Sequence, residues 1–238
     1  MAAGFLKEHV LQSNTYASTR PCRLVILVSG RGSNMQALVQ AMGEQTMAAE
    51  VRAVVSNRAD APALAWAHGQ GLETCVVPHR DYADREQFDA ALAEQIERFE
   101  PDYVLLAGFM RVLTDGFVRR FQGKLVNIHP SLLPAFPGLH THRRALQAGA
   151  AWHGSTVHFV TPAVDEGPII AQWAVPVLAG DTEDTLAARV LQGEHQLYAT
   201  VLGWLTQGRV SLGADGKVQV AGVDCRGFAS LPTEQEAA

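Results

Sequence analysis

Residues 23–42 have the sequence RLVILVSGRGSNMQALVQAM, which joins an apolar run to a helical pattern through a short turn. The run RLVILV is continuously apolar, as expected of a strand that is buried on both faces of a sheet. NMQALVQAM has helical spacing, and the turn SGRGSN between the two contains two glycines. A strand, a glycine turn and a helix in this order are typical of an α/β domain.

The same alternation continues outward from this stretch. Further short apolar runs are VRAVVS, ETCVVP, DYVLLAGF and KLVNIHP. Helical patterns separate most of them, and one of these places Phe88, Leu92, Ile96 and Phe99 on a single face. Because short apolar strands alternate with helices, we predict an α/β fold with a doubly wound, mostly parallel sheet.

The pattern changes in the C-terminal third of the chain. GSTVHFV and GPIIAQWAVPV have no long helix between them, so we expect antiparallel strands there, followed by a long C-terminal helix from about Glu183 to Thr206. We assign residues 23–210 to one domain. Residues 1–22 are expected to be an N-terminal extension, and residues 211–238 a strand or hairpin followed by a frayed tail.

Composition limits the classes of partner. The net charge is -5 and the pI is about 6.0, which argues against a nucleic acid or a membrane as the main partner, since both favour a basic surface. The three cysteines, Cys22, Cys75 and Cys225, are far apart and fit a reducing compartment. The first 22 residues contain neither a secretory signal nor a membrane span, so we expect a cytoplasmic protein.

The turn SGRGSN has two interpretations. Backbone N–H groups at a helix start bind anions, and a single phosphate would suit so short a loop. A dinucleotide site would require a third glycine at Met35 and an acidic residue at Asn57, and a P-loop would require Gly-Lys-Ser/Thr. The alternative is an ordinary turn in which Ser or Asn caps the helix, and the pattern alone leaves both open.

Residues 127–142, NIHPSLLPAFPGLHTH, place a polar pair at a strand end before a proline-rich loop. Asn127 and His129 are two residues apart, so their side chains point to the same face of a strand. Histidine is suited to proton transfer near neutral pH, although a lone strand-end histidine is more often structural. Asp165 lies in the turn TPAVDEGPII and could orient His129 and favour its protonated form, or simply form the turn.

A carboxylate interrupts the apolar stripe of the last helix. Leu186, Val190, Leu197 and Val201 follow helical spacing, and Glu194 falls on the same stripe. A carboxylate on an apolar face is costly without a partner, and an amino group of a ligand would be one. The alternative is that the stripe bends around Glu194 at a solvent margin, helped by Gly193.

Metal and covalent chemistry have little support in the sequence. His140, His142, His153 and His158 do not form a recognised zinc motif. No G-x-S-x-G elbow is present, and no cysteine lies near the histidine motif, so an acyl-enzyme is not expected. We predict a reaction without a metal.

Together these motifs resemble the folate-dependent formyltransferases, and among them the glycinamide ribonucleotide formyltransferases of purine synthesis. The resemblance spans about Arg23 to Arg209. The motifs are SGRGSN, LAGFMRVL, NIHPSLLPAFPGLHTH, HGSTVHFV, VDEGPII and GEHQLY. NIHPSLLP is shared by formyltransferases that use 10-formyltetrahydrofolate, whereas PGLHTH is narrower and indicates the ribonucleotide enzymes. This resemblance implies the Rossmann-like formyltransferase fold.

The resemblance also implies a set of site residues. The catalytic residues would be Asn127, His129 and Asp165. The substrate phosphate would contact Gly32, Ser33 and Asn34, and the rest of the ribonucleotide would contact Leu191, Gln192, Gly193 and Glu194. The folate would contact Arg85, Met110, Arg111, Val112, Leu113, Asn127, Thr161, Pro162, Ala163, Val164 and Asp165.

The implied reaction moves the formyl group of 10-formyltetrahydrofolate directly to the amino group of glycinamide ribonucleotide. The amine attacks the formyl carbon, and the amide of Asn127 and a protonated His129 would donate hydrogen bonds to the oxyanion that forms. Asp165 would keep His129 charged. The partners would be these two small molecules, and the chain would be a monomer or a homodimer.

Three rival functions are weighed against this one. A methionyl-tRNA formyltransferase would require a further C-terminal domain, and a formyltetrahydrofolate hydrolase a regulatory domain before the catalytic one; neither is expected in this sequence. A catalytically silent nucleotide-binding module would not need the complete set of Asn127, His129 and Asp165.

Overall fold

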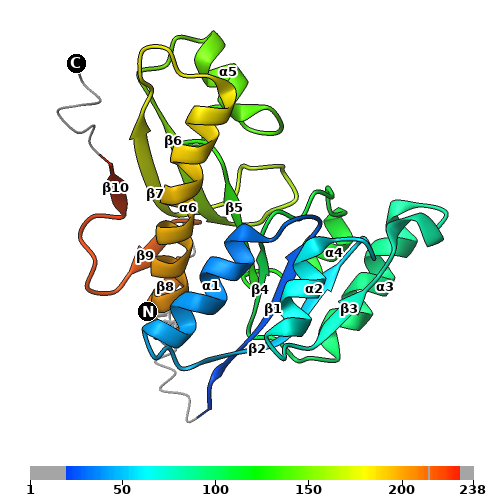
Figure 1. Cartoon of the computed structure of the whole chain (residues 1–238). Helices are drawn as coiled ribbons and strands as arrows, with labels where there is room; N and C mark the ends of the chain where they lie inside the picture. The colour runs from blue at the N-terminus through cyan, green and yellow to red at the C-terminus, as the bar shows by residue number, and fades with distance from the viewer. Residues whose placement is uncertain (1–19, 214, 231–238) are drawn as a thin grey trace, which may run out of the picture.

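The computed structural model describes residues 20–213 and 215–230, and an eight-stranded sheet forms its centre (Figure 1). The strands follow the order β10-β7-β6-β5-β4-β1-β2-β3 across the sheet. In chain order they are β1 (Cys22–Val28), β2 (Ala49–Ser56), β3 (Thr74–Val76), β4 (Tyr103–Leu106), β5 (Leu125–His129), β6 (Trp152–Phe159), β7 (Ile169–Pro176) and β10 (Gly227–Ala229). A separate antiparallel pair consists of β8 (Val210–Leu212) and β9 (Val218–Val220).

The sheet has a parallel half and an antiparallel part, as predicted. Strands β1 to β5 pair only in parallel with one another. Strand β6 pairs antiparallel with both β5 and β7. Chain order reverses at β1, which has β2 on one side and β4 on the other. Parallel sheets of this kind bind ligands at the carboxyl ends of the strands beside such a reversal.

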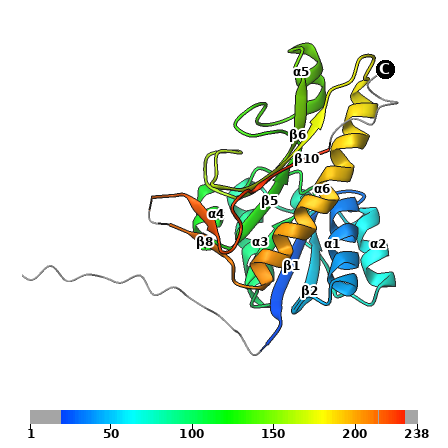
Figure 2. The same ribbon diagram turned by 90° about the vertical axis from the view of Figure 1, so that its left-hand side faces the viewer.

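Helices cover both faces of the sheet. One face carries α1 (Ser33–Glu44), α2 (Pro62–Gly69) and the long α6 (Glu183–Thr206), which lie together on one side in Figure 2. The other face carries α3 (Arg85–Glu97) and α4 (Asp115–Arg120). The short η1 (His79–Asp81) precedes α3, and α5 (Thr141–Gln147) precedes β6.

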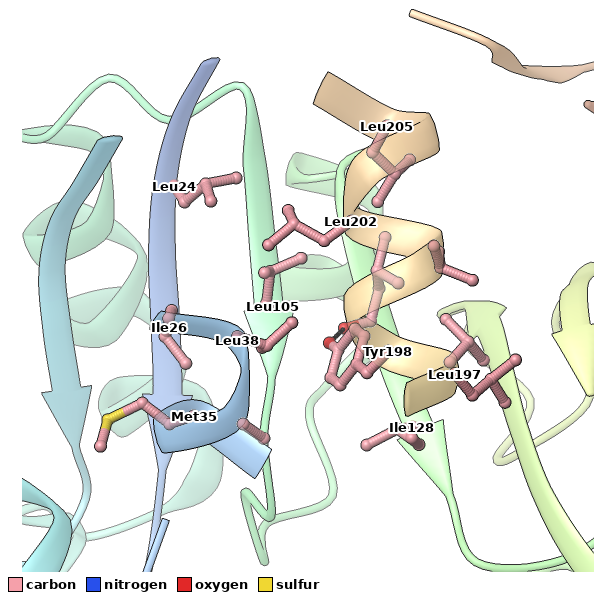
Figure 3. Close-up of a cluster of buried hydrophobic side chains, with 14 of the residues drawn as sticks. Leu24, Ile26, Met35, Leu38, Leu105, Ile128, Leu197, Tyr198, Leu202 and Leu205 are labelled. Carbon is pink, nitrogen blue, oxygen red and sulfur yellow. Dashed lines mark hydrogen bonds between the residues drawn. The ribbon is translucent and has the colours of Figure 1, made fainter. Parts of the chain in front are cut away.

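The core beneath α1 and α6 contains large aliphatic side chains and one buried tyrosine (Figure 3). Met35 and Leu38 of α1 face Ile26 of β1, while Tyr198 lies on α6 over the neighbouring strands. The Tyr198 hydroxyl is within 2.9 Å of the carbonyl oxygen of Val126, so its polar end is satisfied inside the core. Both helices therefore contribute to one core on this face of the sheet.

The core on the opposite face is built from α3 and α4. Phe88, Leu92 and Ile96 of α3 are fully buried, and Phe99 packs against them from the margin, which confirms the predicted stripe. These side chains pack on residues of β1, β2, β4 and β5 that alternate with those facing α1 and α6. Strands β1, β2, β4 and β5 are therefore covered on both faces, as their continuously apolar sequences indicate.

Besides the single-turn η1, three elements were not predicted from the sequence. Two are the short helices α4 and α5, whose few residues give too little periodicity to recognise. The third is β10, which pairs in parallel with β7, so the tail up to Ser230 does not fray. Cys22 belongs to β1 rather than to the extension. Residues 1–19 and 231–238 lie outside the described residues, and the domain boundaries stay predictions.

Candidate active site

The order of the strands brings the predicted motifs to one edge of the sheet. The glycine turn follows β1, the segment from Met110 to Leu113 follows β4, and the loop after His129 follows β5. Strands β1, β4 and β5 are neighbours and run in parallel. Their carboxyl ends therefore meet at the same edge, where an α/β protein of this type binds its ligands.

Asn127 and His129 share one side of β5. Leu125, two residues before Asn127, packs in the core of α3 and α4, whereas Val126 and Ile128 pack under α1 and α6. The alternation of a strand therefore directs Asn127 and His129 toward the α3 side. His129 is buried and Asn127 is half-buried, so little of either side chain faces solvent.

Asp165 lies beside His129, as predicted. Its Oδ2 is 3.4 Å from Nδ1 of His129, and their side chains are only 11% and 8% exposed. The Asp165 backbone has a φ of 57°, in the left-handed region that aspartate tolerates better than most residues. The loop is therefore shaped around this carboxylate.

The proline-rich loop closes over the same group. The N–H of Gly138 donates to Oδ2 of Asp165 at 2.8 Å, and Nε2 of His129 is 3.1 Å from the carbonyl oxygen of Phe136. Both ring nitrogens of His129 thus face acceptors, and both can donate only when each bears a hydrogen. Two contacts, from Phe136 and Gly138, thus join this loop to His129 and Asp165.

His158 is a site residue that was not predicted. It is opposite Asn127 in the β5–β6 ladder, and its Nε2 is 3.3 Å from Nδ2 of Asn127 and 3.9 Å from Oδ1 of Asp165. Its Nδ1 faces the carbonyl oxygen of Phe159 at 3.0 Å, so Nε2 is left as the acceptor for the Asn127 amide. Burial lowers the pKa of His158, which keeps that nitrogen free of a proton. Only the register of the two strands could have identified it.

The glycine turn is not an ordinary capped turn. Gly32 occupies the N-cap of α1 with a φ of 75°, and no side chain caps the helix. A Cβ atom on Gly32 would lie 2.6 Å from the Cβ of Ala63, so this position requires glycine. The interpretation as a Ser or Asn cap is therefore wrong. The first amides of α1 have no intrahelical acceptor and can bind an anion.

Glu194 is buried against α1 rather than lying at a solvent margin, so that alternative is also wrong. It is 7% exposed, and its Oε2 accepts a 2.7 Å hydrogen bond from Nδ2 of Asn34. Burial raises the pKa of Glu194 to about 7, although the hydrogen bond from Asn34 opposes the shift. Oδ1 of Asn34 is buried and has no hydrogen-bond partner within residues 20–213 and 215–230. A ligand with hydrogen-bond donors would satisfy this pair.

The segments assigned to the folate gather on the α3 side. Met110 and Val112 are exposed, Leu113 is buried in the α3–α4 core, and Val160, just before Thr161, packs against that core. Ser29 was not predicted here. Its hydroxyl accepts a 2.8 Å hydrogen bond from the N–H of Met110, so it joins the glycine turn to the folate segment.

The remaining predicted residues surround these groups. Arg85 begins α3 and lines a cavity of about 480 Å³ together with Asp89 and Thr114. That cavity does not include Asn127 or His129. Arg85 is therefore beside the end of the Met110–Leu113 segment and apart from Asn127 and His129. Exposed positions in the loop that carries Asp165 are Pro162, Ala163 and Val164. Beside Glu194, α6 carries Leu191, Gln192 and Gly193. Arg111 lies over the ring of Phe88.

The histidines considered as metal ligands do not form a cluster. Within the described ranges, no group of three or more His, Cys, Asp or Glu side chains could hold a metal ion. His153 and His142 contact each other with their ring nitrogens 3.2 Å apart, and burial lowers the pKa of both. No helix in the part of the chain that the structure describes could span a membrane.

The geometry of this edge agrees with what related sequences show. Residues 22–202 match the model of the family described as formyl transferase. The chain belongs to the formyl transferase family. It is 48% identical over 189 residues to phosphoribosylglycinamide formyltransferase of Escherichia coli, covering 79% of this chain and 89% of that protein. It is also 43% identical over 213 residues to the human trifunctional purine biosynthetic protein adenosine-3, covering 90% of this chain and 21% of that protein.

Solved structures of similar proteins share the fold. A phosphoribosylglycinamide formyltransferase from Coxiella burnetii superposes with a TM-score of 0.82 at 41% identity, covering 89% of this chain and all of that one. A formyltetrahydrofolate deformylase from Pseudomonas syringae gives 0.78 at 25% identity, covering 85% and 66%. The resemblance and the fold class inferred from the sequence motifs are confirmed, and the chain is a transferase of the phosphoribosylglycinamide formyltransferase type.

Proposed function

We propose that the chain transfers the formyl group of 10-formyltetrahydrofolate to the amino group of glycinamide ribonucleotide by direct transfer. The observation that supports this most is the assembled group of Asn127, His129 and Asp165 at the carboxyl end of β5. Asn127 and His129 offer hydrogen-bond donors at one place, and Asp165 orients one of them. A formyl transfer requires such donors, because negative charge develops on the formyl oxygen.

In the proposed reaction, the amine of the ribonucleotide attacks the formyl carbon and forms a tetrahedral intermediate. The amide N–H of Asn127 and the Nε2–H of His129 donate to its oxyanion. The carbonyl oxygen of Phe136, 3.1 Å from Nε2, supports this assignment, since it occupies a position from which an acceptor engages His129. The oxyanion takes the place of that carbonyl as the acceptor.

The collapse of the intermediate breaks the bond between the formyl carbon and the folate nitrogen. The attacking amine must lose a proton, and the departing folate nitrogen must gain one. His129 gives a proton to the folate nitrogen as general acid and regains the proton that the amine releases, while Asp165 orients the imidazole from the other side of the ring. No acyl-enzyme forms, and the proposed mechanism gives no step to a metal.

The two ligands are proposed to bind on different sides of the sheet edge. The phosphate of the ribonucleotide meets the amides of Gly32, Ser33 and Asn34, and Glu194 accepts hydrogen bonds from the rest of that molecule. This is supported by the start of α1, which no side chain caps, and by Oδ1 of Asn34, which has no hydrogen-bond partner in the part of the chain that the structure describes. The folate binds on the α3 side, between the Met110–Leu113 segment and the loop that carries Asp165. Phosphate binding is remote from the reacting atoms and serves orientation.

We place this reaction in the cytoplasm, by a monomer or a homodimer. Cys22, Cys75 and Cys225 are all unpaired in the structure, which supports a reducing compartment. Glycinamide ribonucleotide and the folate are the proposed small-molecule partners, with no nucleic acid or membrane among them.

A spectrophotometric assay that follows loss of the formyl group from 10-formyltetrahydrofolate tests the proposal. We expect turnover when glycinamide ribonucleotide is present and only a trace when water is the acceptor. Equal rates with and without the ribonucleotide would instead indicate a hydrolase, the activity named for the Pseudomonas syringae protein. No turnover under either condition would reject both functions.

A further inference from the structure

The C-terminal segment from Arg226 to Ser230, which we call the strap, runs along the edge of the main sheet. Its strand β10 pairs in parallel with β7, and Phe228 is opposite Trp173. The N–H of Gln172 donates to the carbonyl oxygen of Arg226, and the N–H of Ser230 to that of Ala174. The strap is therefore an integral strand, although no motif of the sequence pointed to it (Figure 1).

The strap fixes the indole ring of Trp173 in position. The rings of Trp173 and Phe228 are stacked, with centroids 5.6 Å apart and planes 16° from parallel. Trp204 of α6 packs on the same phenyl ring at 6.2 Å. The indole Nε1 donates a 2.9 Å hydrogen bond to the hydroxyl of Ser230. Stacking sets the plane of the ring and the hydrogen bond sets its rotation, so Trp173 has little freedom.

Trp173 in turn sets how closely α6 approaches β7. A Cβ atom on Gly193 would lie 2.5 Å from Cδ1 of Trp173 and 2.9 Å from Cγ and Nε1. The helix reaches this distance only because residue 193 has no side chain. Glycine inside a helix is less stable than alanine, so the close approach is the physical reason for glycine here.

The residue after Gly193 is Glu194, whose carboxylate accepts the 2.7 Å hydrogen bond from Asn34. We propose that Trp173, held by Phe228 and Ser230 of the strap, is a positioning residue for Glu194. This inference rests on the proposed function, which assigns Glu194 to the ribonucleotide. The indole acts as a spacer between β7 and α6, and its loss lets this turn of α6 shift against α1. Catalysis on the α3 side of the sheet does not depend on that spacing.

The first test removes the support of the indole without touching the site. We expect Phe228→Ala and Ser230→Ala each to raise the KM for glycinamide ribonucleotide by about threefold to tenfold, the scale of a few lost contacts. The kcat and the KM for the folate should stay within about twofold. Trp152→Ala is the matched control, because Trp152 is an exposed tryptophan on the neighbouring strand β6 and should change none of these values.

The second test uses the contact between Trp173 and Gly193. Gly193→Ala alone forces the new methyl group against the indole and should raise the ribonucleotide KM. In a Trp173→Ala background the same change should instead lower the KM, because the methyl group enters the space that the indole leaves. Phe228→Tyr, which keeps the stack, should keep the original KM. Melting temperatures of all variants identify any that fail to fold.

The outcomes separate the inference from the function on which it rests. If Glu194→Gln raises the ribonucleotide KM while the strap variants and the compensation pair leave it unchanged, the positioning role of Trp173 is wrong and the site assignment holds. If Glu194→Gln itself has no effect on that KM, the assignment of Glu194 fails first. Equal losses in kcat and in both KM values would show that the strap supports only the overall fold.

Discussion

The carboxylates on the two faces of the sheet differ in their hydrogen-bond partners. On the α3 side, Asp165 lies beside His129 and accepts the N–H of Gly138, so its charge has donors around it. On the α1 and α6 side, Glu194 is buried with a single hydrogen bond from Asn34, and burial raises its pKa to about 7. One carboxylate is paired with a histidine, whereas the other is bonded to Asn34, whose own buried Oδ1 has no hydrogen-bond partner among the described residues.

This difference predicts different roles for the two carboxylates, one in the chemical step and one in ligand binding. A carboxylate that is already paired with a histidine can act on charge that develops during the reaction, which affects kcat. A buried carboxylate with a single hydrogen-bond partner favours a ligand that supplies further donors, which affects KM and the stability of the free protein. Each of the following predictions tests one side of this comparison.

The largest effect is expected for the pair of His129 and Asp165. His129→Ala and Asp165→Ala should each lower kcat by about a hundredfold or more, the scale of a lost oxyanion donor or general acid. The double variant should be only slightly worse than the poorer single one, because the two side chains act as a unit. Ligand affinities should change far less. Glu166→Gln changes the exposed neighbour of Asp165 and is the control. If the free-energy losses of His129→Ala and Asp165→Ala simply add in the double variant, these two residues act independently.

A smaller effect is expected when a second charge is placed beside Glu194. Asn34→Asp puts a carboxylate where an amide now donates to Glu194, and also beside the proposed phosphate site. Binding of the ribonucleotide should weaken by at least about tenfold, because like charges repel strongly at a buried site. Calorimetry should find folate binding nearly unchanged. Gln40→Glu adds the same charge to an exposed position on α1, and a similar loss there would mean that the effect is only long-range.

Removing the charge of Glu194 should have a milder effect on binding. Glu194→Gln keeps the size of the side chain but lacks the stronger acceptor, so the ribonucleotide KM should rise by about tenfold, as for a lost hydrogen bond to a charged group. The folate KM should not change. Asp184→Asn, on an exposed position of the same helix, serves as the control. An unaltered ribonucleotide KM would return Glu194 to a purely structural role.

The last prediction concerns the stability of the free protein rather than its kinetics. The pKa of Glu194 is about 7 in the folded protein against an ordinary value of 4.5, so the folded state favours the protonated carboxyl group. Its contribution is fully present below pH 4.5 and is lost as the pH rises through 7, by on the order of 3 kcal/mol. Glu194→Gln should therefore lose less stability than the wild type between pH 5 and pH 8. Denaturant titrations at both values measure this, and parallel changes in the two proteins would contradict the raised pKa.

The sequence by itself determined the fold class and singled out the candidate catalytic residues. Continuously apolar strands alternating with helices can be buried only in a sheet covered on both faces, which explains why the parallel half was predictable. Asn127 and His129 were identified because a strand alternates its side chains, a rule that needs no tertiary contact. Glu194 stood out for a similar reason, since helical spacing placed it on the stripe of Val190 and Leu197.

Only the tertiary structure decided which partners these residues have. The pairing of Glu194 with Asn34 joins positions 160 residues apart, and no local pattern contains it. His158 reaches Asn127 through the register of an antiparallel ladder, and a shift by one residue would turn it to the other face. The reason for glycine at position 193 of α6 is its close approach to Trp173, which lies on β7 and is distant in sequence. Propensity and periodicity act along the chain, whereas charge, burial and packing depend on what lies across it.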